Sequence, residues 1–116
     1  MKHEQVFLKH ILDEIDFLIK ENENKKFEEF IKDEVLKRAC SRSLEIIGEA
    51  VKNLPPDFKK KYKEIEWKKI AGLSDKIIHY YFGVNCDILW DVIRNQLPKL
   101  KEQVGTILRQ FEAQKM

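Results

Sequence analysis

Apolar residues recur along nearly the whole chain at intervals of three and four residues, the spacing that places side chains on one face of an α-helix. The chain contains only four glycines and three prolines, so few positions interrupt this pattern. We therefore expect an all-α fold. A first helix over about residues 4–20 is predicted by one such row, formed by Leu8, Leu12, Ile15 and Ile19.

A long second helix is expected to begin after Asp33, whose carboxylate can accept hydrogen bonds from N–H groups of a first helical turn. Pro55 and Pro56 should end this helix, because proline lacks an N–H and disfavours helical geometry in the residue before it. A polar stretch, DFKKKYKEIE, follows. The buried stripe of the long helix should consist of Leu36, Cys40, Ser43, Ile47, Ala50 and Leu54.

Three further helices are predicted in the C-terminal half. One begins at Trp67 and ends near Gly83, and Asp87 is the expected cap of the next, ILWDVIRNQL. Pro98 is placed to start a last helix. A chain of this length fits one domain, residues 1–116, so we predict a single up-and-down bundle of four to five helices.

The charge balance limits the kinds of partner. The chain has 22 basic and 20 acidic residues, a net charge of +2, so contact with nucleic acid is expected to be local. Cys40 and Cys86 form no CxxC pair and are too few for a disulfide framework, which favours a reducing cytoplasm. We expect no membrane span and no signal peptide, because charges interrupt every apolar run.

Common metal and nucleotide motifs are missing from the sequence. It contains no HExxH, no paired CxxC and no glycine-rich phosphate-binding loop. We therefore expect no metal site and no cofactor.

The stretch SDKIIHYYFG carries the most specific candidate chemistry. Asp75 and His79 are four residues apart, so on a helix the carboxylate could accept from the imidazole and prepare it for acid–base work. Tyr81 lies just beyond, near the expected helix end. Taken by itself, the spacing favours a surface histidine and two tyrosines that pack at a helix end.

A second polar stripe runs down the long helix through Arg38, Arg42, Glu45 and Glu49. These residues could form intrahelical salt bridges or one wall of a polar cleft. An aromatic concentration around residues 80–90 could stack on RNA bases or fill the core. We favour the core for Trp67, Phe82 and Trp90, and Tyr81 stays open.

Three segments in order resemble a known family. RSLEIIGEAVKNLP (42–55), EIEWKKIAGLSDKIIHYYFGV (64–84) and LWDVIRNQLPKLKEQV (89–104) resemble the HepT-like branch of the HEPN superfamily. The resemblance covers nearly the whole chain. It implies a helical-bundle homodimer that acts on RNA rather than DNA as a metal-independent endoribonuclease, the toxin of a type VII-like toxin–antitoxin pair.

The family's motif is an arginine, four residues, a histidine, one residue and a tyrosine. Laid on this chain, the motif assigns the catalytic histidine to His79 and the tyrosine to Tyr81, with Asp75 as the polar residue that follows the arginine position. Ser74 occupies that arginine position and cannot supply its positive charge. Lys76 and Arg42 are the neighbouring cations that could compensate, and with Glu45 and Glu49 they are candidate cleft residues.

The resemblance also implies a partner, a minimal nucleotidyltransferase antitoxin that transfers AMP from ATP to the motif tyrosine, Tyr81. The added phosphate and bulk would repel RNA from the cleft. Because Tyr81 is kept while the arginine is not, a second hypothesis stands beside the RNase toxin. On that hypothesis the chain is a catalytically impaired subunit that binds the nucleotidyltransferase or a nucleotide, and a purely structural helical dimer is a third.

Overall fold

The computed structural model describes residues 2–78 and 85–114, and every regular element in these ranges is helical. Short segments connect the long helices: α2 (Phe27–Lys32), α4 (Pro56–Lys61), α6 (Cys86–Asp91) and the π-helical turn η1 (Val92–Gln96). The predicted all-α class is therefore confirmed. The long helices are α1 (Lys2–Asn22), α3 (Glu34–Asn53), α5 (Trp67–Ile78) and α7 (Leu97–Gln114).

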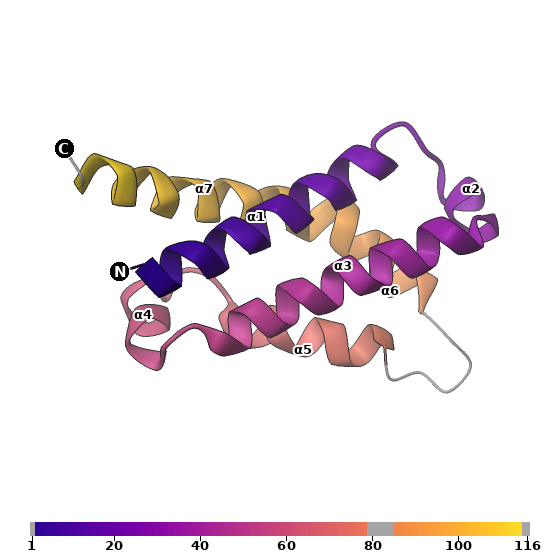
Figure 1. Ribbon diagram of the computed structural model, residues 1–116. Coiled ribbons are helices and arrows are strands. Elements are labelled where there is room, and N and C mark those ends of the chain that lie inside the picture. Colours follow the sequence, from indigo (N-terminus) through magenta and orange to yellow (C-terminus); the bar gives the residue numbers. More distant parts are fainter. Residues whose placement is uncertain (1, 79–84, 115–116) are drawn as a thin grey trace.

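The four long helices run alternately in opposite directions along the molecule (Figure 1). α3 packs against α1 on one side and against α5 on the other, and α1 also packs against α7. This order confirms the predicted up-and-down bundle. The described helices form an elongated body of 47 × 28 × 20 Å.

The buried faces of α3 and α1 differ in how well the spacing predicted them. The predicted stripe of α3 is buried at every position, from Leu36 to Leu54. On α1, Ile11 and Leu18 are fully buried, while Leu12 and Ile19 are only partly covered. Because α1 packs against both α3 and α7, its buried face is wider than the single row that the sequence indicated.

The helix caps are set by short polar side chains. The Asp33 carboxylate accepts from the Leu36 N–H at 2.9 Å, as predicted for the start of α3. At α6 the prediction of Asp87 as cap is wrong. Asn85 is the cap instead, and its side-chain oxygen accepts from the Ile88 N–H at 3.1 Å, because the capping residue must precede the first helical turn.

The polar stretch after Pro55 contains α4, a helix that the periodicity did not reveal. Pro56 occupies its first turn, where a missing N–H costs nothing. Phe58 is the buried residue of this helix, and its ring packs against Tyr62 at 4.9 Å and Phe111 at 6.3 Å between centroids. Tertiary packing of one aromatic ring therefore anchors a segment whose other residues are a proline and four charged residues.

The last two predicted helices are continuous. α6, η1 and α7 follow one another without a break, and the Leu97 N–H donates to the Val92 carbonyl across the wider π turn. Pro98 lies directly after this turn. Proline cannot donate the next helical hydrogen bond, and the local widening lets the helix continue past it.

The expected end of the α5 helix near Gly83 lies outside the described residues. Within the described ranges, none of the helices is long and apolar enough to cross a membrane.

Candidate active site

α5 carries the described part of the candidate motif, and its start is held by the preceding turn. The Ile65 N–H donates to the Tyr62 carbonyl at 3.1 Å, and the indole N–H of Trp67 donates to the same carbonyl at 3.1 Å. Trp67 is itself buried. These contacts hold the start of α5, the helix whose sequence includes Ser74, Asp75 and Lys76.

Asp75 lies opposite a cation from another helix. Lys52 Nζ on α3 lies 3.6 Å from Asp75 Oδ1, and both side chains are about half exposed, at 52% and 54%. His79, the partner that the four-residue spacing suggested for Asp75, lies outside the described residues, as does Tyr81. The roles assigned to His79 and Tyr81 therefore stay predictions.

The structure places the four candidate cleft residues on two different surfaces. Arg42 and Glu49 line a hollow of about 250 Å³ on the α1–α3 side, together with His10. Lys76 instead lines a groove between α3, α4 and α5. Arg42 also forms an ion pair with Glu45 one turn away on α3, as one of the two interpretations of that stripe expected.

Lys52 is the residue that sequence reasoning missed. It stands 22 residues before Ser74, so no helical spacing connects the two positions. The antiparallel packing of α3 on α5 brings Lys52 to Asp75, the residue next to Ser74. Of the two cations proposed from the sequence, Arg42 faces α1, whereas Lys76 shares the α3–α4–α5 groove with Lys52.

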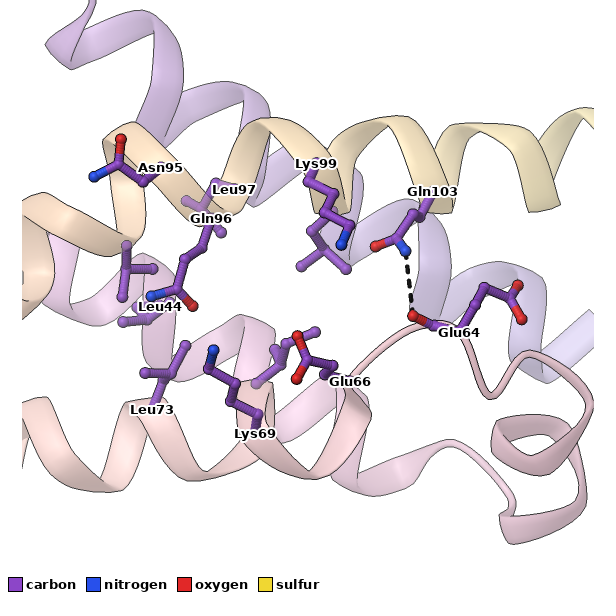
Figure 2. Close-up of a pocket in the computed structure, with 13 residues that line it drawn as sticks. Leu44, Glu64, Glu66, Lys69, Leu73, Asn95, Gln96, Leu97, Lys99 and Gln103 are labelled. Atoms are coloured by element: carbon purple, nitrogen blue, oxygen red, sulfur yellow. Dashed lines mark hydrogen bonds between the residues drawn. The ribbon is translucent and has the colours of Figure 1, made fainter.

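A smaller cavity of about 110 Å³ lies between α5 and the η1–α7 segment and shares Glu66, Lys69 and Leu73 with the α3–α4–α5 groove (Figure 2). Lys69 and Glu66 reach it from the α5 side, and Lys99 and Gln103 from α7. Gln103 also donates to the Glu64 carbonyl at 3.4 Å. Pockets that take nucleotide-sized ligands usually have about 300–1,000 Å³, so this cavity is too small for such a ligand.

Across residues 2–78 and 85–114, no three His, Cys, Asp or Glu side chains come together in a way that could hold a metal ion. The two cysteines are far from equivalent, since Cys40 is buried and Cys86 is partly exposed.

Comparison with known proteins identifies the family. Residues 11–107 match the family described as Ribonuclease HepT-like. The chain is 53% identical over 109 residues to Putative RNase TTE0752 of Caldanaerobacter subterraneus subsp. tengcongensis, a match that covers 94% of this chain and 97% of that protein. The chain therefore belongs to the HepT-like ribonuclease family of the HEPN superfamily, as the ordered motifs predicted.

Two archaeal relatives extend this comparison. Putative RNase MJ0127 of Methanocaldococcus jannaschii is 42% identical over 113 residues, with 97% of this chain and 93% of that protein covered. Probable ribonuclease HepT of Thermococcus cleftensis is 41% identical over 95 residues, with 82% and 86% covered. No solved structure matches the chain significantly.

Proposed function

We propose that the chain is a metal-independent endoribonuclease that acts as the toxin of a toxin–antitoxin pair. The observation that carries the proposal is membership of the HepT-like ribonuclease family across residues 11–107, a span that includes His79 and Tyr81, the residues to which we assign the motif. RNA can be cut without a metal because its 2′-hydroxyl is a built-in nucleophile. A base removes the 2′-proton, the oxygen attacks the adjacent phosphorus, and an acid protonates the departing 5′-oxygen.

His79 is the acid or base of this reaction on our proposal, because it stands at the motif histidine. A homodimer would bring two copies of His79 to one cleft and so supply both an acid and a base. The third requirement is positive charge beside the phosphorus, where negative charge accumulates in the transition state. Ser74 stands where the family's motif has arginine, so this charge must come from another residue.

We assign that charge to Lys52, with Lys76 as a second contributor. The ion pair of Lys52 with Asp75 holds an ammonium group beside the residue that follows Ser74. Lys52 reaches this position from α3, whereas an arginine at position 74 would reach it from α5 itself. An ammonium group is a point charge and lacks the fork of donors that a guanidinium presents to phosphate, so we expect slower cleavage than with arginine.

Cleavage of RNA in the presence of a chelator tests the proposal. Purified protein should cut single-stranded RNA, and His79→Ala should lower the rate by roughly a hundredfold or more. His3→Ala is the matched control, because His3 is an exposed histidine of α1. Equal rates for the protein and for His79→Ala would contradict the assignment. Expression of the protein or of His3→Ala should arrest growth, whereas expression of His79→Ala should not.

Tyr81 is the proposed site at which the antitoxin acts. A minimal nucleotidyltransferase would join the α-phosphorus of ATP to the phenol oxygen and release pyrophosphate, which places a charged AMP group at the RNA cleft. Incubation with the product of the adjacent gene and ATP should add AMP units to Tyr81, detected by mass spectrometry. Tyr81→Phe should stay unmodified and toxic.

The serine at position 74 favours one alternative. If the missing arginine abolishes catalysis, the chain is a non-enzymatic subunit that binds the nucleotidyltransferase or a nucleotide. On that alternative RNA survives incubation with the purified protein, while a stable complex with the product of the adjacent gene still forms. Cleavage that depends on His79 would exclude it.

A further inference from the structure

A groove of about 940 Å³ lies where the end of α3, α4 and the first three turns of α5 meet. Its floor is apolar and closed, because Val51, Ile65, Trp67 and Leu73 are all buried. The groove is open above Gly72, where a Cβ atom would meet nothing within 4 Å beyond its chain neighbours and the backbone of its own helix. α5 is about 18 Å long, so the groove offers an extended track rather than an enclosed pocket.

The rim of this groove is almost uniformly basic. It carries seven lysines and one acidic side chain, Glu66, although the whole chain has a net charge of only +2. Residues 1–51 carry nine basic and twelve acidic side chains, so the positive charge is concentrated on this one surface. We call it the lysine groove, and its lysines are Lys52, Lys59, Lys60, Lys63, Lys68, Lys69 and Lys76.

Six of these seven lysines are exposed. Lys60, Lys63 and Lys68 are exposed, and in the described part of the chain they form no ion pair with an acidic side chain. Lys59 is partly buried, and its Nζ donates to the Val51 carbonyl at 3.2 Å. A surface with several uncompensated like charges repels itself, and a polyanion that binds there relieves this repulsion.

We propose that the lysine groove binds the phosphodiester backbone of single-stranded RNA, outside the catalytic motif. This inference rests on the proposed ribonuclease function, because it names where the substrate chain runs. Lysines are point charges without a preferred base partner, so the groove would hold phosphates and would not select a base sequence. Lys76 lines the groove and stands three residues before His79 in the sequence. The groove therefore includes a lysine that is close in sequence to the proposed catalytic histidine.

The composition of the groove favours RNA over an acidic protein partner. Lysine is depleted at protein–protein interfaces, whereas arginine and exposed aromatic residues are enriched there. The groove contains no arginine, and its aromatic residue, Trp67, is buried with its N–H already bonded to the Tyr62 carbonyl. The described lining of the groove therefore offers no exposed ring that could stack on a side chain of a protein partner or on an RNA base. Charge is left as the main source of binding.

Fluorescence anisotropy with a labelled oligouridylate of about 20 nucleotides tests this proposal. All proteins carry His79→Ala, so that the probe stays intact. The groove variant combines Lys60→Gln, Lys63→Gln and Lys68→Gln, and the matched control removes the same charge elsewhere through Lys9→Gln, Lys20→Gln and Lys32→Gln. These three control lysines are exposed on α1 and α2 and do not line the groove.

The groove variant should raise the Kd at least about tenfold at about 0.1 M salt, and the control variant less than about twofold. The slope of log K against log salt should fall by about 2 in the groove variant, because three phosphate contacts to a single strand are lost. Replacing the same three lysines with arginine should retain binding. Equal losses in both variants, unchanged RNA binding in the groove variant, or no binding by the parent would overturn the proposal.

The RNA-binding test and the cleavage test can fail independently of each other. If the protein with His79 intact cuts RNA while the groove variant binds the probe normally, the proposed function stands and the lysine groove is not its RNA track. An acidic protein would then be the better occupant. If the probe binds through the groove but no RNA is cut, the catalytic proposal fails and the binding site stands.

Discussion

Lys52 Nζ lies 3.6 Å from Asp75 Oδ1 and joins α3 to α5 at the residue next to Ser74. The ion pair gives Asp75 a partner from another helix, whereas spacing alone suggested His79 as a partner on its own helix, and that contact stays a prediction. Because both side chains are about half exposed, their ion pair contributes little to folding, about 1 kcal/mol at most. We therefore expect the ion pair to matter more for RNA cleavage, through its position beside the candidate motif, than for the stability of the fold.

Lys52→Gln should therefore reduce RNA cleavage far more than it reduces stability. We expect the rate to fall roughly tenfold to a hundredfold, because a positive charge near the phosphorus is lost. The free energy of unfolding, measured with urea, should change by less than about 1 kcal/mol. Lys52→Arg should retain most activity, and Lys20→Gln on α1 is the control. Full activity in Lys52→Gln would refute the assignment of charge to this lysine.

Ser74→Arg should restore the family's arginine and raise cleavage by roughly tenfold or more, because a guanidinium holds phosphate with two donors. Cleavage by this variant should also depend less on Lys52, since both cations would stabilise the same negative charge at the phosphorus. A double-mutant cycle of Ser74→Arg with Lys52→Gln measures this coupling. Strictly additive effects on the logarithm of the rate would show that the two positions act independently.

Arg94 ties the turn after α1 to the π-helical segment. One of its nitrogens, Nη2, donates to the Asn22 carbonyl at 2.7 Å and also to the Lys25 carbonyl, and its guanidinium lies 4.4 Å from the centroid of the Trp90 ring. Arg94→Ala should lower the free energy of unfolding by about 1–2 kcal/mol, a value reduced for the exposure of the side chain. Urea unfolding measures it, with Arg109→Ala as the control. Equal stability of the two variants would contradict this role.

The thiol of Cys40 should make stability depend on alkaline pH. Burial raises the pKa of the Cys40 thiol above its ordinary value, and the Asn22 amide, 3.5 Å from Sγ, offsets part of this. The unfolded chain therefore loses the proton at a lower pH than the folded chain. Stability is fully present below the ordinary thiol pKa of about 8.5 and falls as the pH rises toward the higher folded value.

Urea unfolding from pH 7 to pH 10 tests this prediction. The stability of the protein relative to Cys40→Ala should decline above about pH 8.5, with a slope of at most about 1.4 kcal/mol per pH unit. The comparison with Cys40→Ala removes the contribution of the lysines and tyrosines, which titrate in both proteins. A difference that stays constant over this range would show that the thiol does not titrate differently in the two states.

Local chemistry predicted the fold well where one residue decides the structure. Asp33 caps α3, and Pro55 with Pro56 separates α3 from α4, because capping and the missing N–H act within a single turn. The π turn before Pro98 was not predictable in this way. It depends on how α6 and α7 share one helical path, and a proline in the sequence is equally compatible with a break.

The sequence by itself determined the helical class and the family, because periodicity and ordered motifs are properties of the linear chain. The motif roles of Ser74, His79 and Tyr81 stay predictions from the sequence. Only the tertiary structure decided which distant charges share a surface. It separated Arg42 from Lys76, brought Lys52 to Asp75, and gathered seven lysines around one groove in a chain whose net charge is close to zero. Helical spacing relates residues within one helix, whereas the packing of α3, α4 and α5 relates residues that the spacing cannot connect.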